Sequence, residues 1–287
     1  MEATELLKKV RRIEIKTRGL SKHIFAGEYH SAFKGRGIAF SEVREYQYGD
    51  DIRSIDWNVT ARFNHPYVKI FEEERELTVM LLIDVSGSGN FGSTGSFKRD
   101  LMTEVAAVLS FSAIFNNDKI GVIFFSDKVE KFITPLKGSR HILRIIRELL
   151  DFKSQSQKTN LDEPLRFLTN AIKKRCTAFI ISDFFVPDFE EAMRIASSKH
   201  DIVALKVLDP LEKAIPNVGL IKVLDAETGS EEWIDTSSVA TRDAYEQWWI
   251  NHINMIKNIF KRCGVDSAEL RTDLDYVNPL MKLFKSR

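Results

Sequence analysis

From residue 76 to the C-terminus, the sequence alternates short apolar runs with segments of helical periodicity. Three of these runs are almost continuously apolar, as strands buried on both faces of a sheet are: 76–84, 119–127 and 176–184. Segments between and after them carry apolar residues three and four positions apart, which is typical of amphipathic helices: 97–115, 140–152, 161–174 and 189–200. The alternation predicts βαβ units and a mostly parallel sheet covered by helices.

The remaining segments extend this architecture. The sequence further predicts an antiparallel edge strand at 128–135, a strand at 201–209, a hairpin at 221–237, a long helix at 239–262, a strand near 266–272 and a last helix near 276–285. The predicted fold class is α/β, a doubly wound, mostly parallel, Rossmann-like sheet with helices on both faces, over residues 76–287. Residues 1–75 are predicted to form an N-terminal α+β segment packed on this domain, with a strand near 67–71 joining the main sheet.

Composition excludes several classes of protein. The chain has 42 Lys and Arg against 41 Asp and Glu, so it lacks the basic excess of a nucleic-acid-binding protein. No apolar stretch reaches the length of a membrane span, and the N-terminus does not resemble a signal peptide. Two cysteines are too few for a disulfide framework. These features predict a cytoplasmic protein.

Polar side chains follow two of the predicted strands, where ligands bind in open α/β sheets. Asp84, Ser86 and Ser88 come after the first buried strand, and Asp183 follows the strand that begins near 176. Thr159 precedes the helix at 161–174. Because these residues fall at the same edge of the predicted sheet, we expect their side chains to lie close together.

Hydroxyl and carboxylate oxygens are the ligands that Mg²⁺ prefers, and Mn²⁺ accepts the same donors. Neutral hydroxyls as direct ligands would leave the ion with much of its charge, so it would attract an acidic residue of a partner protein. We find no base or nucleophile beside these residues, and therefore expect a binding site rather than a catalytic one.

Other interpretations of this loop remain. Residues 87–92 match G-x-G-x-x-G, but a helix is expected only near Ser96, and Asp84 would repel a pyrophosphate. Residues 87–94 approximate a P-loop that has Ser93 in place of lysine. The alternative function is thus a metal-assisted phosphohydrolase or a nucleotide-binding enzyme that uses this glycine-rich loop. In isolation, residues 84–88 are also compatible with a turn capped by Asp and Ser side chains.

The set Asp84-x-Ser86-x-Ser88, Thr159 and Asp183 resembles the metal-ion-dependent adhesion site of von Willebrand factor A domains. The resemblance implies that the serines and the threonine contact the metal, and that the aspartates act directly or through water. It also implies that an acidic residue of the partner completes the coordination.

Motifs along the rest of the chain resemble the bacterial family called domain of unknown function 58. The motifs that carry this resemblance are 35–37, 42–46, 49–53, 55–57, 60–62, 72–76, 225–229 and 234–236. The resemblance implies an adaptor that works with a MoxR-type AAA+ ATPase in chaperone-like assembly or maturation. Among the N-terminal residues, we expect Arg36, Arg44, Arg53 and Arg62 to form ion pairs with nearby acids, and Trp57 to lie in a core.

Overall fold

The computed structural model describes residues 39–72, 77–93, 97–186, 188–224 and 230–287. The chain forms two compact units, one of residues 34–77 and one that contains residues 78–287. The two units are therefore described individually.

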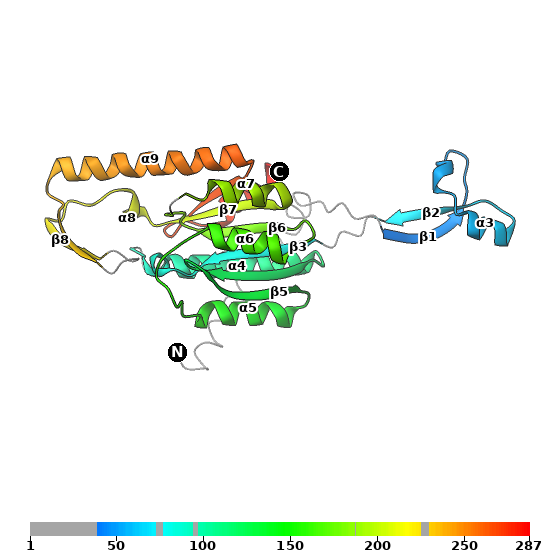
Figure 1. Ribbon diagram of the computed structural model, residues 1–287, viewed down its shortest axis with the longest axis horizontal. Coiled ribbons are helices and arrows are strands. Elements are labelled where there is room, and N and C mark those ends of the chain that lie inside the picture. Colours follow the sequence, from blue (N-terminus) through cyan, green and yellow to red (C-terminus); the bar gives the residue numbers. More distant parts are fainter. Residues whose placement is uncertain (1–38, 73–76, 94–96, 187, 225–229) are drawn as a thin grey trace. The chain divides into compact units, whose positions relative to one another are not determined.

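The larger unit is built on a six-stranded sheet (Figure 1). Its strands are β3 (Thr78–Asp84), β4 (Lys119–Phe125), β5 (Val129–Leu136), β6 (Thr177–Ser182), β7 (Asp201–Leu208) and β10 (Asp266–Arg271). They lie in the order β10-β7-β6-β3-β4-β5, and only the β4–β5 pair is antiparallel. The chain first extends the sheet from β3 to β4 and β5, and then places β6 on the other side of β3. The switch in direction therefore lies between β3 and β6.

The helices of this unit are α4 (Lys98–Phe115), α5 (Ser139–Asp151), α6 (Asp162–Ala171), α7 (Glu190–Lys199), α8 (Pro210–Lys213), α9 (Val239–Cys263) and α10 (Val277–Lys285). One face of the sheet packs against α6, α7 and α9, through a core cluster that includes Leu82, Ile180, Leu165, Met193 and Ile256. Helices α4, α5 and α10 cover the opposite face, where α4 packs on α5 and Phe284 contacts Phe179. Because both faces are covered, the central strands are apolar at successive positions and not at alternate ones.

Local signals place the ends of α9, which has 25 residues. Ser238 accepts a hydrogen bond from the backbone N–H of Thr241 and so caps its N-terminus. Gly264 ends the helix in the left-handed conformation, with φ at 64°, which a residue without Cβ adopts at little cost. None of the helices in the described residues is both long and apolar enough to cross a membrane.

The hairpin predicted at 221–237 consists of β8 (Leu220–Leu224) and β9 (Glu231–Asp235), which pair in antiparallel fashion. The predicted turn at 227–229 lies outside the described residues. The predicted fold class is confirmed: a doubly wound, mostly parallel sheet with helices on both faces and one antiparallel edge strand.

The smaller unit contains β1 (Ala39–Glu45), a 3-10 turn at Ile52–Ser54, α3 (Trp57–Phe63) and β2 (Tyr67–Glu72). The prediction that a strand near 67–71 joins the main sheet is wrong, because β2 pairs with β1 in a separate two-stranded sheet. An apolar strand pattern indicates that a strand forms, but not which strand it pairs with.

Two further expectations fall on this unit. Arg44 pairs with Asp50 through two hydrogen bonds, of 2.7 and 2.8 Å, so this pair lies within the unit. Trp57 is 67% exposed, so it does not lie in a core formed by this unit alone. Helix α3 buries none of its residues, so it offers no core to its first side chain. The predicted packing of this segment on the main domain stays a prediction, and Arg36 lies outside the described residues.

Candidate functional site

The five predicted site residues lie at the carboxyl end of the sheet, around the switch point between β3 and β6. Asp84 is the last residue of β3, and Asp183 follows the last residue of β6. Ser86 immediately precedes a short 3-10 helix, η3 (Gly87–Asn90), and Ser88 is the second residue of that helix. In open α/β sheets, this crevice is where ligands bind.

Asp84 is buried, and each of its carboxylate oxygens accepts a hydrogen bond. Oδ1 accepts from the backbone N–H of Ser86 at 3.0 Å, and Oδ2 accepts from the hydroxyl of Ser182 at 2.7 Å. Burial, together with the charge of Asp183, raises the pKa of Asp84 to about 6. A nearby cation would relieve both effects.

The two serine hydroxyls have a spacing that suits a small divalent cation. Ser86 Oγ and Ser88 Oγ are hydrogen-bonded to each other at 3.1 Å, and either hydroxyl could be the donor. Two oxygens that bind one Mg²⁺ at 2.0–2.1 Å and at right angles are separated by about 3 Å. The serine pair therefore fits adjacent positions of an octahedral shell with little movement.

Thr159 is buried in a neighbouring loop, 7% exposed, and it is not hydrogen-bonded to the other four residues within the described part of the chain. Its loop is held in place from both sides. The N–H of Gly87 donates to the carbonyl of Gln157 at 3.1 Å, and the N–H of Asn160 donates to the carbonyl of Ser126 at 3.0 Å. The structure thus ties the Thr159 loop to the Ser86–Ser88 turn through the backbone.

Asp183 is 1% exposed, and both of its oxygens are engaged. Oδ1 accepts from the N–H of Phe185 at 3.1 Å, and Oδ2 accepts from Lys98 Nζ at 2.7 Å. Burial opposes the charge of Asp183, but the Lys98 ammonium and a hydrogen bond from Ser88 outweigh burial and lower its pKa. Each oxygen of Asp183 accepts one hydrogen bond, as each oxygen of Asp84 does, so each keeps a second lone pair.

Lys98 is a site residue that sequence reasoning missed. Its side chain is fully buried at the start of α4, where it contacts Asp183 at 2.7 Å and Glu212 of α8 at 2.5 Å. Burial would lower the pKa of Lys98, but the two carboxylates more than compensate and raise it. The helix dipole disfavours a cation at a helix N-terminus. A lysine at the start of a predicted helix is therefore the sequence feature that could have indicated an acidic residue close to it.

An aromatic cluster fixes the backbone after Asp183. Phe184 adopts a positive φ of 60°, and the ring of Phe185 stacks on His252 with centroids 4.6 Å apart and planes 4° apart. Phe185 also contacts Trp249, at 5.1 Å between centroids. Helix α9 therefore holds the loop that carries Asp183.

Two further observations define the chemistry of the site. The described residues contain no group of three or more His, Cys, Asp or Glu that could hold a metal ion. The glycine-rich loop does not lead straight into a helix, because α4 begins at Lys98, six residues after Gly92. This differs from the strand–loop–helix context of a dinucleotide fingerprint.

The arrangement of strands and helices in the larger unit has counterparts among solved structures. The chain covers 97% of an aerotolerance-related membrane protein from Bacteroides fragilis NCTC 9343, with 73% of this chain aligned, 17% identity and a TM-score of 0.50. The VWA domain of SpRpn10 aligns over 74% of this chain and 95% of that domain, with 10% identity and a TM-score of 0.40.

The profile of the family described as "Protein of unknown function DUF58" matches residues 42–254, and the chain belongs to this family. A relative of similar length is the uncharacterized protein Rv1480 of Mycobacterium tuberculosis (strain ATCC 25618 / H37Rv). It is 29% identical over 283 residues, which are 97% of this chain and 88% of the relative.

Proposed function

We propose that the protein is a non-enzymatic interaction module that binds partners in a divalent-metal-dependent manner. The metal is Mg²⁺ or Mn²⁺, and its ligands come from Asp84, Ser86, Ser88, Thr159 and Asp183. The observation that carries the proposal is the Ser86–Ser88 oxygen separation of 3.1 Å beside a buried carboxylate at the switch point of the sheet.

Each residue has a distinct part in this proposal. Ser86 and Ser88 supply neutral oxygens, so the bound ion would keep enough charge to attract a carboxylate of a partner. Asp84 holds the negative charge that makes the site attractive to a cation, and the hydroxyl of Ser182 fixes its orientation. Asp183 would add a second negative charge, acting on the ion directly or through water, and Lys98 and the N–H of Phe185 fix its position.

We further propose that the partner supplies an acidic residue, and that the protein acts in the cytoplasm as an adaptor for a MoxR-type AAA+ ATPase in assembly or maturation. Membership of the DUF58 family supports this partner class, through the resemblance described above. The site itself supports only an acidic group on the partner, because the cation and its hydroxyl ligands would attract a carboxylate from any protein.

A retention experiment tests the proposal. The tagged wild-type protein, Asp84→Ala and the control Asp151→Ala are exposed to native extract in Mg²⁺ or in EDTA. Asp151 is an exposed carboxylate at the end of α5, and it is not one of the five proposed ligands. We expect a partner that wild type and Asp151→Ala retain in Mg²⁺, and that EDTA or Asp84→Ala releases. Retention that depends on neither EDTA nor Asp84 would contradict metal-dependent binding.

A further inference from the structure

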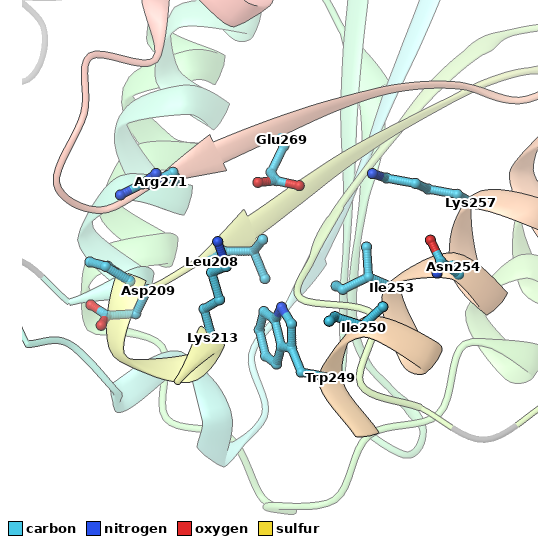
Figure 2. Close-up of a pocket in the computed structure, with 11 residues that line it drawn as sticks. Leu208, Asp209, Lys213, Trp249, Ile250, Ile253, Asn254, Lys257, Glu269 and Arg271 are labelled. Atoms are coloured by element: carbon cyan, nitrogen blue, oxygen red, sulfur yellow. The ribbon is translucent and has the colours of Figure 1, made fainter. Parts of the chain in front are cut away.

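A cavity of about 440 Å³ opens beside the candidate metal site, between α9 and the ends of β7 and β10 (Figure 2). Trp249, Ile250 and Ile253 of α9 form an apolar wall, and Leu208 at the end of β7 faces them. This volume and this mixture of apolar wall and charged rim are typical of cavities that bind a specific ligand group.

The cavity lies on the same edge of the sheet as Asp84 and Asp183. Strand β7, which supplies Leu208, is hydrogen-bonded to β6, which precedes Asp183. Neighbouring strands are about 4.8 Å apart. One extended segment of a partner could therefore contact both the cavity and the metal site.

Two structural links connect the cavity to the metal site. Trp249 lines the cavity and also packs on Phe185, whose N–H donates to Asp183 at 3.1 Å. On α8, Glu212 forms an ion pair with Lys98, and the next residue, Lys213, lines the cavity. The two features thus share walls at both α9 and α8.

The charged groups of the cavity favour an anion. Arg271 is paired with Asp273, and Glu269 lies directly opposite the buried Lys206 in the register of β10 and β7. In contrast, Lys213 and Lys257 are exposed and have no ion pair within the described residues.

The carboxylate of Asp209 also lines the cavity. It accepts hydrogen bonds from Ser93, Leu211 and Thr272. Burial would raise the pKa of Asp209, but these donors lower it, so the carboxylate stays ionised. Its one negative charge is outweighed by the two positive charges of Lys213 and Lys257.

We infer that this cavity is a second contact point for the partner, and that it takes an apolar side chain flanked by a carboxylate. The apolar side chain packs on Trp249 and Ile250, and the carboxylate pairs with Lys213 and Lys257. That the group in the cavity belongs to the same partner that binds at the metal site rests on the proposed function. The preference for an apolar group with a carboxylate does not, because these four residues alone provide it.

The first test uses N-acetyl-L-phenylalanine as the probe, with its amide as a matched neutral compound. The readout is the indole N–H signal of Trp249, one of four tryptophans in the chain, assigned in an NMR spectrum with Trp249→Phe. We expect the acid to shift this signal saturably in EDTA, and the amide to bind at least threefold more weakly. No saturable shift, or equal binding of acid and amide, would overturn the inference.

Variants locate the binding. Ile250→Glu places a charge on the apolar wall, and Ile195→Glu on α7 is its matched control, because the two isoleucines are 40% and 41% exposed. We expect Ile250→Glu to weaken the acid at least tenfold and Ile195→Glu to leave it unchanged, with the other indole signals reporting an intact fold. Equal effects of the two variants would contradict binding in this cavity.

The last arm separates this inference from the proposed function. Asp84→Ala should bind N-acetyl-L-phenylalanine as wild type does, whether or not the metal site exists. In the retention experiment, Ile250→Glu should lose the metal-dependent partner, while Ile195→Glu keeps it. A partner that still needs Mg²⁺ but ignores Ile250→Glu would overturn the inference and leave the proposed function standing. Binding of the probe without any metal-dependent partner would contradict the proposed function and support the cavity.

Discussion

The body of the main sheet and its carboxyl edge are equally buried but differ in chemistry. In the body, Leu81, Leu82 and Ile180 are 0% exposed and contact only other parts of the packed interior. At the edge, Asp183 and Lys98 are as deeply buried and carry opposite charges. Burial of an apolar side chain contributes about 1.5–3 kcal/mol, whereas burial of charged pairs contributes little net stability. The comparison teaches that stability comes from the body, whereas the edge holds buried charges at little net gain in stability.

The largest expected effect comes from breaking the buried ion pairs. Lys98→Met should lower the free energy of unfolding by about 3–5 kcal/mol, because it leaves the buried Asp183 and the partly buried Glu212 without a counter-charge. Urea unfolding measures the change. Combining Lys98→Met with Asp183→Asn and Glu212→Gln should recover part of the loss. A small effect of Lys98→Met alone would show that Asp183 and Glu212 do not depend on the Lys98 ammonium as their counter-charge.

The next effect concerns pH. Burial raises the pKa of Asp84 to about 6, from a usual value of 3.8, so the folded state holds this proton more tightly than the unfolded state. The associated stability is present below pH 3.8 and is lost as pH rises through about 6. In EDTA, wild type should therefore lose up to about 3 kcal/mol relative to Asp84→Asn between pH 4 and 7. A difference that stays constant over this range would show that Asp84 titrates normally.

A substitution in the body of the sheet gives a contrasting result. A Cβ atom on Gly121 of β4 would lie 2.9 Å from the carbonyl oxygen of Ile133 and 2.8 Å from Met80 Sδ. Gly121→Ala should therefore destabilise the protein by about 1–3 kcal/mol, at any pH and with or without metal. Differential scanning calorimetry in Mg²⁺ and in EDTA measures this. A loss of stability that differs between Mg²⁺ and EDTA would indicate that packing in the body of the sheet affects the site at its carboxyl edge.

The smallest effect should have the opposite sign. Lys206 of β7 is 5% exposed, and burial lowers its pKa to about 8. Its neighbour Glu269 is exposed, so removal of the lysine leaves no buried charge unpaired. Lys206→Met should raise the free energy of unfolding at pH 7 by about 1 kcal/mol. Destabilisation would show that Lys206 is held by interactions that exceed its burial cost.

The body of the fold could be predicted because its signals are local. The apolar runs at 76–84 and 176–184 are typical of strands covered on both faces, and β3 and β6 fall inside them. The antiparallel edge strand at 128–135 was predicted from the short gap before it, and β5 confirms it. The carboxyl ends of parallel strands meet at one edge, so the proximity of Asp84 and Asp183 also followed from the sequence.

What could not be predicted depends on contacts between distant segments. Lys98 meets Glu212 across 114 positions, and α8, which carries Glu212, has only 4 residues and no detectable periodicity. The cavity beside Trp249 needs α9 to lie against the ends of β7 and β10, which no motif encodes. The pairing of β2 with β1 likewise depends on a choice between partners that an alternating pattern does not make.

Direct measurement of Mn²⁺ binding tests the central claim, a metal site at the carboxyl edge. Electron paramagnetic resonance of free Mn²⁺ is followed during titration with protein, in the presence of acetate as a substitute for the partner's carboxylate. We predict that wild type and Asp151→Ala bind one Mn²⁺, which Mg²⁺ displaces, and that Asp84→Ala and Ser86→Ala bind at least ~10-fold more weakly. Equal Mn²⁺ binding by wild type and Asp84→Ala, or no binding by any of the proteins, would contradict the account.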